Sequence, residues 1–166
     1  MKVAWTEIIW NSYITPKHAF ILLLGARSKL LTKDKLKHLN IDRRYIFCGV
    51  DEETECHLFF SCPISFAILG HVRDWLGIRR SMSTRPSALK WIKKEVQWTT
   101  WHSKAKWIAL ASTIYHLWMA CNRDIFEDLT PNVEGIVRKI KTHVYKVIFS
   151  SYPYVLILFE SLTFDV

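Results

Sequence analysis

Apolar side chains recur along most of the chain at steps of three and four residues, which is the spacing of one face of an α-helix. The clearest stripe lies in residues 103–126, where it predicts a long helix with one buried face. Related patterns and short apolar runs predict further helices at residues 3–13, 17–28, 32–39, 63–76, 86–97 and 130–149. The fold class is therefore predicted to be mainly α, a small helical domain.

Residues that favour helix ends lie between these apolar segments. Pro16 is placed to open a helix at its first turn, and Thr32 is placed as the N-cap of the next one. Thr54 is predicted to cap a short helix over residues 54–61, and Gly77 is a stop signal. The predicted loops are residues 42–53 and the aromatic segment 98–102.

The polar and basic segment 78–85 is the best candidate for a linker. It divides residues 1–77, which hold most of the cysteines, from a helical half of the same domain at residues 78–149. Residues 150–166 change character, because they are aromatic and aliphatic and carry no basic charge. A strand and a disordered end both fit this tail.

Composition narrows the class of protein. Half of the 166 residues are hydrophobic and eight are tryptophan, which is enough apolar material for one core. The formal net charge of +8 favours polyanionic partners, or reflects solvated lysine alone. No apolar run reaches the ~20 residues of a membrane span and no secretory signal is recognised, so an intracellular protein without a membrane partner is expected.

Four residues with metal-ligating side chains fall within a short span: Cys48, Cys56, His57 and Cys62. Thiolate and imidazole are the ligands that zinc prefers. Without a secretory signal, cysteines near a histidine indicate metal ligands or buried thiols rather than disulfides. We therefore predict a zinc-knuckle-like insert, with Cys48 from a loop and His57 and Cys62 from a short helix. The alternative is a decayed site of small buried thiols.

The same segment resembles a known family. The matching motifs are Cys48-Gly49, Glu52-Glu53-Thr54, His57-Leu58-Phe59-Phe60 and Cys62-Pro63. They are similar to the zinc-binding domain (zf-RVT) that follows the reverse transcriptase in plant non-LTR retrotransposons, which reads C-x-x-C-G, E-E-T and H-L-F-F-x-C-P. Weaker matches extend the resemblance from about Trp5 to Phe126. The resemblance implies a zinc cofactor and a non-enzymatic fragment that holds RNA or DNA beside a polymerase, in the nucleus if that role is kept.

The chain departs from the family pattern at two informative positions. The first cysteine of the family falls on Tyr45, so one of four zinc ligands is missing, and a phenol of pKa ~10 is a poor substitute. The arginine that precedes Asn122 in the family is Cys121 here. Cys56 and His71 are the candidates for a fourth ligand. One interpretation of these departures is that the chain is a diverged copy of the family domain, or a non-functional relic of it.

Basic residues gather in two parts of the chain and are candidates for phosphate contacts. Trp91, Trp98 and Trp101 lie near the second group and are able to stack on unpaired bases, although a core position is the preferred interpretation for Trp91 and Trp107. No base-reading motif is present in the sequence, so non-specific binding of RNA or DNA is expected. The candidate residues are Lys33, Lys37, Arg43, Arg44, Arg79, Arg80, Lys93 and Lys94.

Catalysis has little support in the sequence. Asp51, Glu52 and Glu53 are consecutive, whereas metal-dependent nucleic-acid chemistry needs carboxylates gathered from separate segments. Neither a phosphate-binding glycine loop nor a nucleophile motif is present. The prediction is a protein that is not an enzyme and has no small-molecule substrate. The alternative is a metal-free helical domain that binds another protein through exposed aromatic side chains.

Overall fold

The computed structural model describes residues 9–95, 100–127 and 132–155, and this part of the chain is mainly helical, as predicted. Its α-helices are α2 (Pro16–Ala26), α3 (Pro63–Trp75), α4 (Arg85–Glu95), α5 (Trp101–Glu127) and α6 (Val133–Ser151). Shorter elements are a π-helical turn at His57–Ser61 and 3₁₀ turns at Lys33–Lys35 and Pro153–Val155. Within the described residues, extended pairing is limited to one isolated antiparallel bridge between Arg44 and Glu52.

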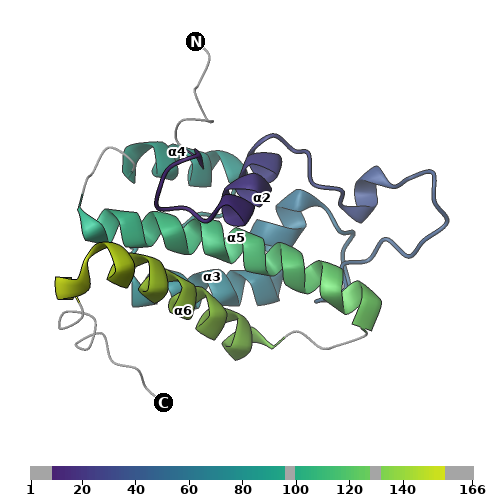
Figure 1. The fold of residues 1–166 in the computed structure, drawn as a ribbon. Coiled ribbons are helices and arrows are strands. Elements are labelled where there is room, and N and C mark those ends of the chain that lie inside the picture. Colours follow the sequence, from purple (N-terminus) through teal and green to yellow (C-terminus); the bar gives the residue numbers. More distant parts are fainter. Residues whose placement is uncertain (1–8, 96–99, 128–131, 156–166) are drawn as a thin grey trace, which may run out of the picture.

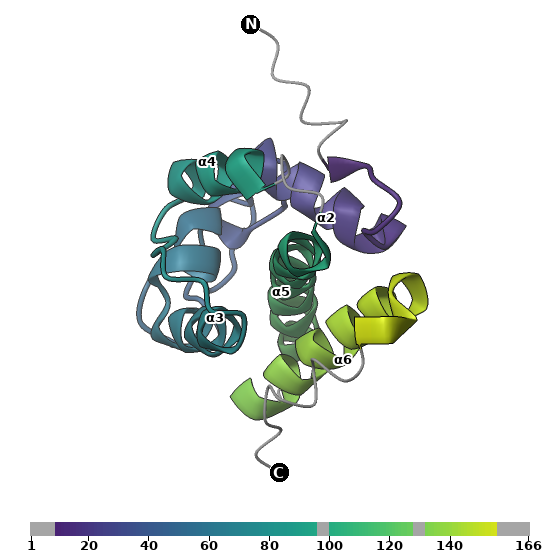
Figure 2. The ribbon, with the colours of Figure 1, turned by 90° about the vertical axis from the view of Figure 1, so that its left-hand side faces the viewer.

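Helix α5 is the central element of the bundle. Figure 2 shows it nearly end-on, with α2, α3, α4 and α6 around it. Helices α2 and α6 pack along α5, and α3 packs against α6. The long connection between α2 and α3 lies beside the C-terminal half of α5 (Figure 1), and it carries the cysteines of the predicted metal site.

Side chains from both sides of the predicted boundary at residue 77 share one hydrophobic core, while the boundary itself stays a prediction. Burial of each such side chain contributes about 1.5–3 kcal/mol, so this shared core is what holds the helices together. Trp91 and Trp107 are buried in it, which is the position preferred for them. Representative core residues from five elements, none more than 3 % exposed, are Leu22, Leu58, Ile68, Ile108 and Ile140.

Two predicted helix ends are confirmed. Pro16 lies in the first turn of α2, where its missing N–H costs no hydrogen bond. Gly77 follows the end of α3 with a φ of +63°, a left-handed conformation that glycine adopts without strain. Among the described residues, no helix is both long and apolar enough to span a lipid bilayer.

The helix predicted at residues 32–39 is wrong, since the structure has only the 3₁₀ turn Lys33–Lys35 there. The turn closes with 3₁₀ hydrogen bonds, since the Lys35 N–H donates to Thr32 O at 2.9 Å and the Leu36 N–H donates to Lys33 O at 3.1 Å. Glu53 binds the free N–H groups at its start: Oε1 accepts from the Lys33 N–H at 3.3 Å, and the backbone carbonyl accepts from the Asp34 N–H at 3.2 Å. The segment is thus held against a distant part of the chain as a short turn.

Other boundaries also differ from the prediction. Residues 11–13 form a turn instead of the end of a helix. Trp101 is the first residue of α5 and does not belong to a loop, and α6 continues to Ser151. Ile78 and Met82 of the predicted linker are buried, so that segment packs against the core. Predictions for Trp5, residues 96–97, Trp98, residues 130–131 and residues 156–166 lie outside the described residues.

Candidate metal centre

Residues 43–53 form a closed loop that presents Cys48. A backbone hydrogen bond from the Tyr45 N–H to Asp51 O, 2.7 Å long, joins its two sides. At the tip, Gly49 has a φ of +65°, and its N–H donates to Tyr45 O at 2.8 Å. Because a residue with a Cβ is strained in this conformation, Gly49 maintains the tight turn that follows Cys48.

His57 and Cys62 are brought to the same side of the chain by the π-helical turn. Thr54 begins the segment as predicted, because its Oγ1 accepts a hydrogen bond from the His57 N–H at 3.0 Å. The turn closes where the Cys62 N–H donates to His57 O at 2.9 Å, a hydrogen bond of the π type. In an α-helix, residues at this separation point about 140° apart. The wider turn reduces that angle, so the imidazole and the thiol both approach Cys48.

These three side chains meet at one point. The ligand atoms of Cys48, His57 and Cys62 all lie within 4.8 Å of one another, and Cys48 Sγ is 3.2 Å from His57 Nε2. Around tetrahedral zinc, ligand atoms are about 3.5 to 3.8 Å apart, given Zn–S and Zn–N bonds of about 2.3 and 2.0 Å. The 3.2 Å separation lies just below this range, and the 4.8 Å limit on the other separations includes it. The group can therefore hold a metal ion, and two sulfurs with one imidazole suit zinc.

The second ring nitrogen of His57 faces a carboxylate. Asp51 Oδ2 lies 3.6 Å from His57 Nδ1, slightly beyond a direct hydrogen bond. Zinc-bound histidines usually donate their other N–H to a carboxylate or carbonyl, which sets the tautomer and the ring orientation. Because Nε2 faces Cys48 and Nδ1 faces Asp51, the ring is oriented to bind a metal ion through Nε2.

Cys62 occupies the N-cap of α3, directly before Pro63. Burial raises the pKa of the Cys62 thiol, and hydrogen bonds from the backbone N–H groups of Ser65 and Ile64 oppose this effect. The same N–H groups at the start of a helix stabilise a thiolate once a metal ion displaces the thiol proton. The position of Cys62 therefore favours the metal-bound form of the side chain.

The fourth ligand position of the family is not filled by a suitable side chain. Tyr45 is completely buried, and its ring lies perpendicular to that of His57 with centroids 5.4 Å apart. Burial raises the pKa of the phenol, and the neighbouring Cys121 raises it further, so Tyr45 stays protonated. Cys56 is exposed, with its Sγ 3.9 Å from Ser61 Oγ, and the exposed His71 also lies outside the group.

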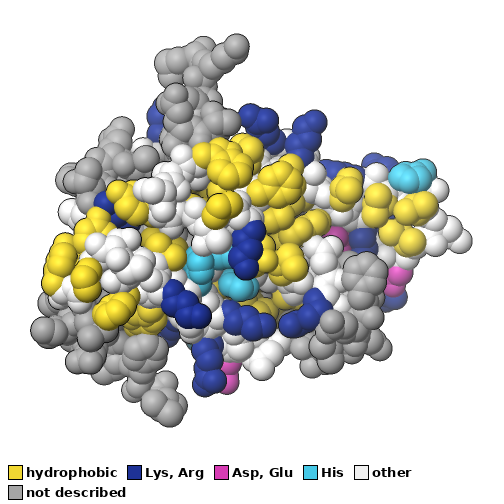
Figure 3. Space-filling model, in the orientation of Figure 1, with side chains coloured by type: hydrophobic (Ala, Val, Ile, Leu, Met, Phe, Trp, Pro, Cys, Tyr) yellow, Lys and Arg dark blue, Asp and Glu magenta, His cyan; other side chains and the backbone are white. Residues whose placement is uncertain are grey.

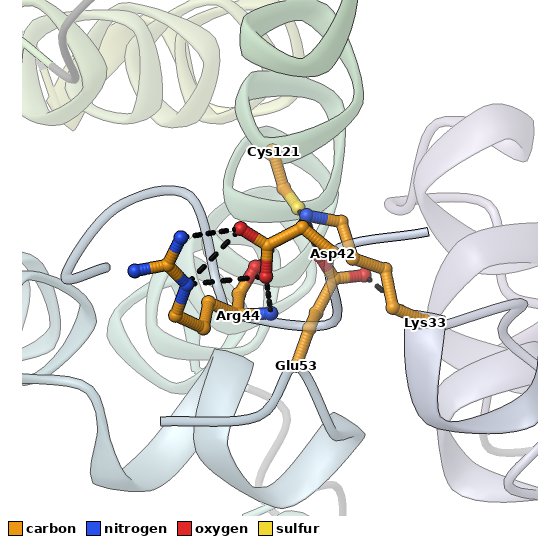
Figure 4. A network of polar contacts seen from close by, with 5 residues as sticks. All are labelled: Lys33, Asp42, Arg44, Glu53 and Cys121. Atoms are coloured by element: carbon orange, nitrogen blue, oxygen red, sulfur yellow. Dashed lines mark hydrogen bonds and ion pairs between the residues drawn. The ribbon is translucent and has the colours of Figure 1, made fainter. Parts of the chain in front are cut away.

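A buried polar network ties the loop to α5 (Figure 4). Glu53 is 2 % exposed, and burial raises the pKa of its carboxyl group while Lys33 lowers it. Lys33 Nζ lies 3.7 Å and Cys121 Sγ 3.6 Å from the same oxygen, Glu53 Oε2. Outside this network, Asp42 accepts hydrogen bonds from Arg44. The sequence marks Glu53 only as part of a matching motif; its structural role depends on partners far away in the chain.

The basic residues predicted to contact phosphate fall into two groups. One group forms ion pairs with acidic residues of the loop connection: Lys33, Arg43 and Arg44. These pairs neutralise charge locally, which makes their members weaker candidates for phosphate contacts. The second group consists of exposed side chains: Lys37, Arg79, Arg80, Lys93 and Lys94.

The loop and the π turn bring two thiols and one imidazole together on a helical bundle. This arrangement is typical of a zinc-binding module. Residues 1–68 match the zf-RVT family, described as zinc-binding in reverse transcriptase. The match confirms the resemblance over the segment that contains all three ligands, and this type of domain is a non-catalytic part of reverse transcriptases. No curated protein and no solved structure gives a significant match to the chain.

Proposed function

We propose that this chain is a non-enzymatic fragment of a retrotransposon reverse transcriptase polyprotein that binds zinc and nucleic acid. The observation that carries the proposal is the meeting of Cys48, His57 and Cys62 within 4.8 Å of one another, inside the segment that matches the family. The role of such a module is to hold element RNA or target DNA beside a polymerase.

In this proposal zinc is structural. When bound, zinc cross-links its ligands without redox chemistry, and the binding free energy adds to the stability of the fold. Cys48 belongs to the loop, His57 to the π turn and Cys62 to the start of α3. Zinc therefore fastens the loop, through Cys48, to the π turn and to the start of α3.

Nucleic-acid binding is supported by charge and exposure. The formal net charge is +8, and the exposed basic group at Lys37, Arg79, Arg80, Lys93 and Lys94 is available to phosphate. Such contacts release counterions from the nucleic acid and carry no base preference. Non-specific affinity that falls steeply with salt is the expected behaviour.

Metal analysis tests the zinc site. Purified protein is expected to contain about one zinc ion per chain. His57→Ala removes a ligand and should weaken zinc binding by about 100-fold or more in competition with a chromophoric chelator. Cys56→Ala is the matched control, since Cys56 is adjacent but lies outside the group, and it should retain zinc. Equal zinc affinity in wild type and His57→Ala contradicts the assignment.

Binding of short single-stranded RNA and DNA, measured by fluorescence anisotropy at several salt concentrations, tests the second part. Arg79→Gln/Arg80→Gln should weaken binding of all sequences uniformly and reduce the salt dependence. Protein without metal and without salt-dependent affinity would favour the alternative, a metal-free helical domain that binds another protein.

A further inference from the structure

His18 of α2, His116 of α5 and His143 of α6 form a histidine cluster between three helices. The ring centroid of His18 lies 4.2 Å from that of His143 and 5.7 Å from that of His116. At the start of α2, Thr15 Oγ1 is 3.1 Å from His143 Nε2. His18 is buried, whereas His116 and His143 are partly exposed. The metal centre and its supporting network use none of these side chains.

Lysines surround the histidine cluster. Figure 3 shows histidine side chains in the middle of one face of the molecule, with Lys and Arg side chains around them. Lys17 lies 5.1 Å from the centre of the Tyr115 ring, and that ring contacts His18 at 4.3 Å between centroids. From α6, Lys139 and Lys146 contribute positive charge beside the cluster.

The three lysines are exposed, and none of them has an acidic partner among the described residues. Lys139 and Lys146 flank His143 on one face of α6, at steps of four and three residues. Neither they nor Lys17 forms an ion pair within the part of the chain that the structure describes. Positive charge from two helices therefore converges over the cluster, and no acidic side chain that the structure describes pairs with it, so the electrostatic field there attracts an anion.

The histidines offer hydrogen bonds rather than charge. Burial, together with positive charges nearby, lowers the pKa of His18 to about 3 and that of His116 to about 4, and it also lowers the pKa of His143. Each ring is therefore neutral at neutral pH and keeps one N–H donor. Nδ1 of the buried His18 has no hydrogen-bond partner among the described residues.

We propose that the histidine cluster, with Lys17, Lys139 and Lys146, is a binding site for phosphate groups of a nucleic-acid backbone. The lysines supply the charge, and His116 and His143 donate hydrogen bonds from the partly exposed layer. The buried His18 contacts both rings from the interior and is a positioning residue. The inference rests on the proposed function and deepens it, because it assigns a phosphate-contacting surface on α2, α5 and α6.

Other ligands fit this surface less well. Within the described residues, the group whose ligand atoms converge tightly enough for a metal ion is Cys48, His57 and Cys62, and the histidine cluster does not meet that condition. A single free phosphate gains little from exposed lysines, because water and salt screen them. A polymer gains more, since each neutralised phosphate releases condensed counterions.

A pair of matched double variants tests the site. Lys139→Gln/Lys146→Gln removes two charges from the edge of α6 that faces the cluster. Arg138→Gln/Lys141→Gln removes the same charge from the same helix; Arg138 is exposed, and Lys141 lies over Trp75 of α3, 5.5 Å from the ring centre. Both variants and wild type are titrated against a short single-stranded RNA at several salt concentrations.

The expected result is a smaller salt slope for Lys139→Gln/Lys146→Gln alone. Each lost phosphate contact on a single strand lowers the magnitude of the log–log slope by about 0.7, so the loss is about 1.4. Equal slopes in the two variants overturn the inference while the proposed function stands. Absence of salt-dependent binding by wild type overturns both.

Histidine ring resonances in NMR spectra distinguish the sources of phosphate. Addition of the RNA is expected to shift the His116 and His143 ring signals, and inorganic phosphate at equal ionic strength should shift them far less. The exposed His71 of α3, which is not adjacent to any of the basic residues proposed to contact phosphate, is the internal control and should not move with them. Equal shifts with inorganic phosphate would assign the site to a free anion, and unchanged signals with RNA overturn the inference.

Discussion

At the residue scale, Tyr45 and Cys121 are best understood together. The resemblance places a cysteine at the first position and an arginine at the second. The buried phenol of Tyr45 lies close enough to Cys121, Cys62 and Glu53 for their charges to raise its pKa. Glu53 Oε2 is 3.6 Å from Cys121 Sγ, where a longer basic side chain would meet the carboxylate. A large residue at one position accompanies a small one at the other, and we expect the two positions to be energetically coupled.

A double-mutant cycle tests this coupling. Cys121→Arg alone should destabilise the protein by about 1–3 kcal/mol, because the added side chain overpacks the site beside Tyr45. Tyr45→Cys alone should cost about 2–4 kcal/mol through the cavity that it leaves. The double variant should be more stable than the sum of the two effects predicts, by about 1 kcal/mol or more, and should bind zinc more tightly than wild type. Chemical denaturation and chelator competition provide the two measurements.

Strict additivity in that cycle would show that the two positions do not share space or charge. Zinc affinity that does not rise with Tyr45→Cys, alone or in combination, would contradict the alignment of Tyr45 with the absent cysteine. The two readouts therefore separate the packing argument from the ligand argument.

At the element scale, the π-helical turn His57–Ser61 is the feature that converts a helical segment into a metal site. Its first residue is held by Thr54, whose Oγ1 accepts from the His57 N–H. Thr54→Ala should therefore cost about 1 kcal/mol of stability and weaken zinc binding, because the imidazole loses its fixed backbone. Thr54→Ser keeps the acceptor and should behave as wild type. If the alanine variant binds zinc as tightly as the serine variant, the cap does not position His57.

The elements also show what sequence patterns can and cannot predict. Pro16 and Gly77 act locally, so their helix ends are predictable, and the long apolar stripe of α5 is equally clear. At residues 32–39 a short 3₁₀ turn replaces the expected helix, where Lys33 and Lys35 contact Glu53 and Glu55 far along the chain, and a local pattern contains no sign of these contacts. Periodicity also does not distinguish an α turn from the π turn at His57–Ser61.

The candidate site divides in the same way. Ligand types and the family resemblance predict Cys48, His57 and Cys62, and the structure brings them together. Sequence proximity includes Cys56 as well, but adjacent residues on a helical turn point in different directions, and Cys56 is exposed. The histidine cluster leaves no trace in the sequence, because each member comes from a different helix and only packing around α5 joins them.

At the scale of the whole molecule, the histidine cluster makes stability depend on pH. The ordinary histidine pKa of 6.5 applies to the unfolded chain, whereas the folded values are about 3 for His18 and about 4 for His116. As pH falls below 6.5, the unfolded chain takes up protons that the folded chain refuses. The contribution of the histidines to the free energy of unfolding is therefore complete above that pH and declines as pH falls toward the folded pKa values. For His18 the loss is at most about 2 kcal/mol at about pH 5.

Urea denaturation of the metal-free protein over this pH range measures the decline, and His18→Phe identifies its source. Phenylalanine keeps an aromatic ring between α2, α5 and α6 but binds no proton, so this variant should lose stability less steeply on acidification. His38→Gln, at an exposed position, should leave the slope unchanged. The raised pKa of the Glu53 carboxyl acts in the opposite direction, because its folded form takes up a proton first and favours folding as pH falls. Stability that rises on acidification would therefore mean that Glu53 outweighs the histidines. A His18→Phe variant with the same pH dependence as wild type would contradict a cluster held neutral by burial.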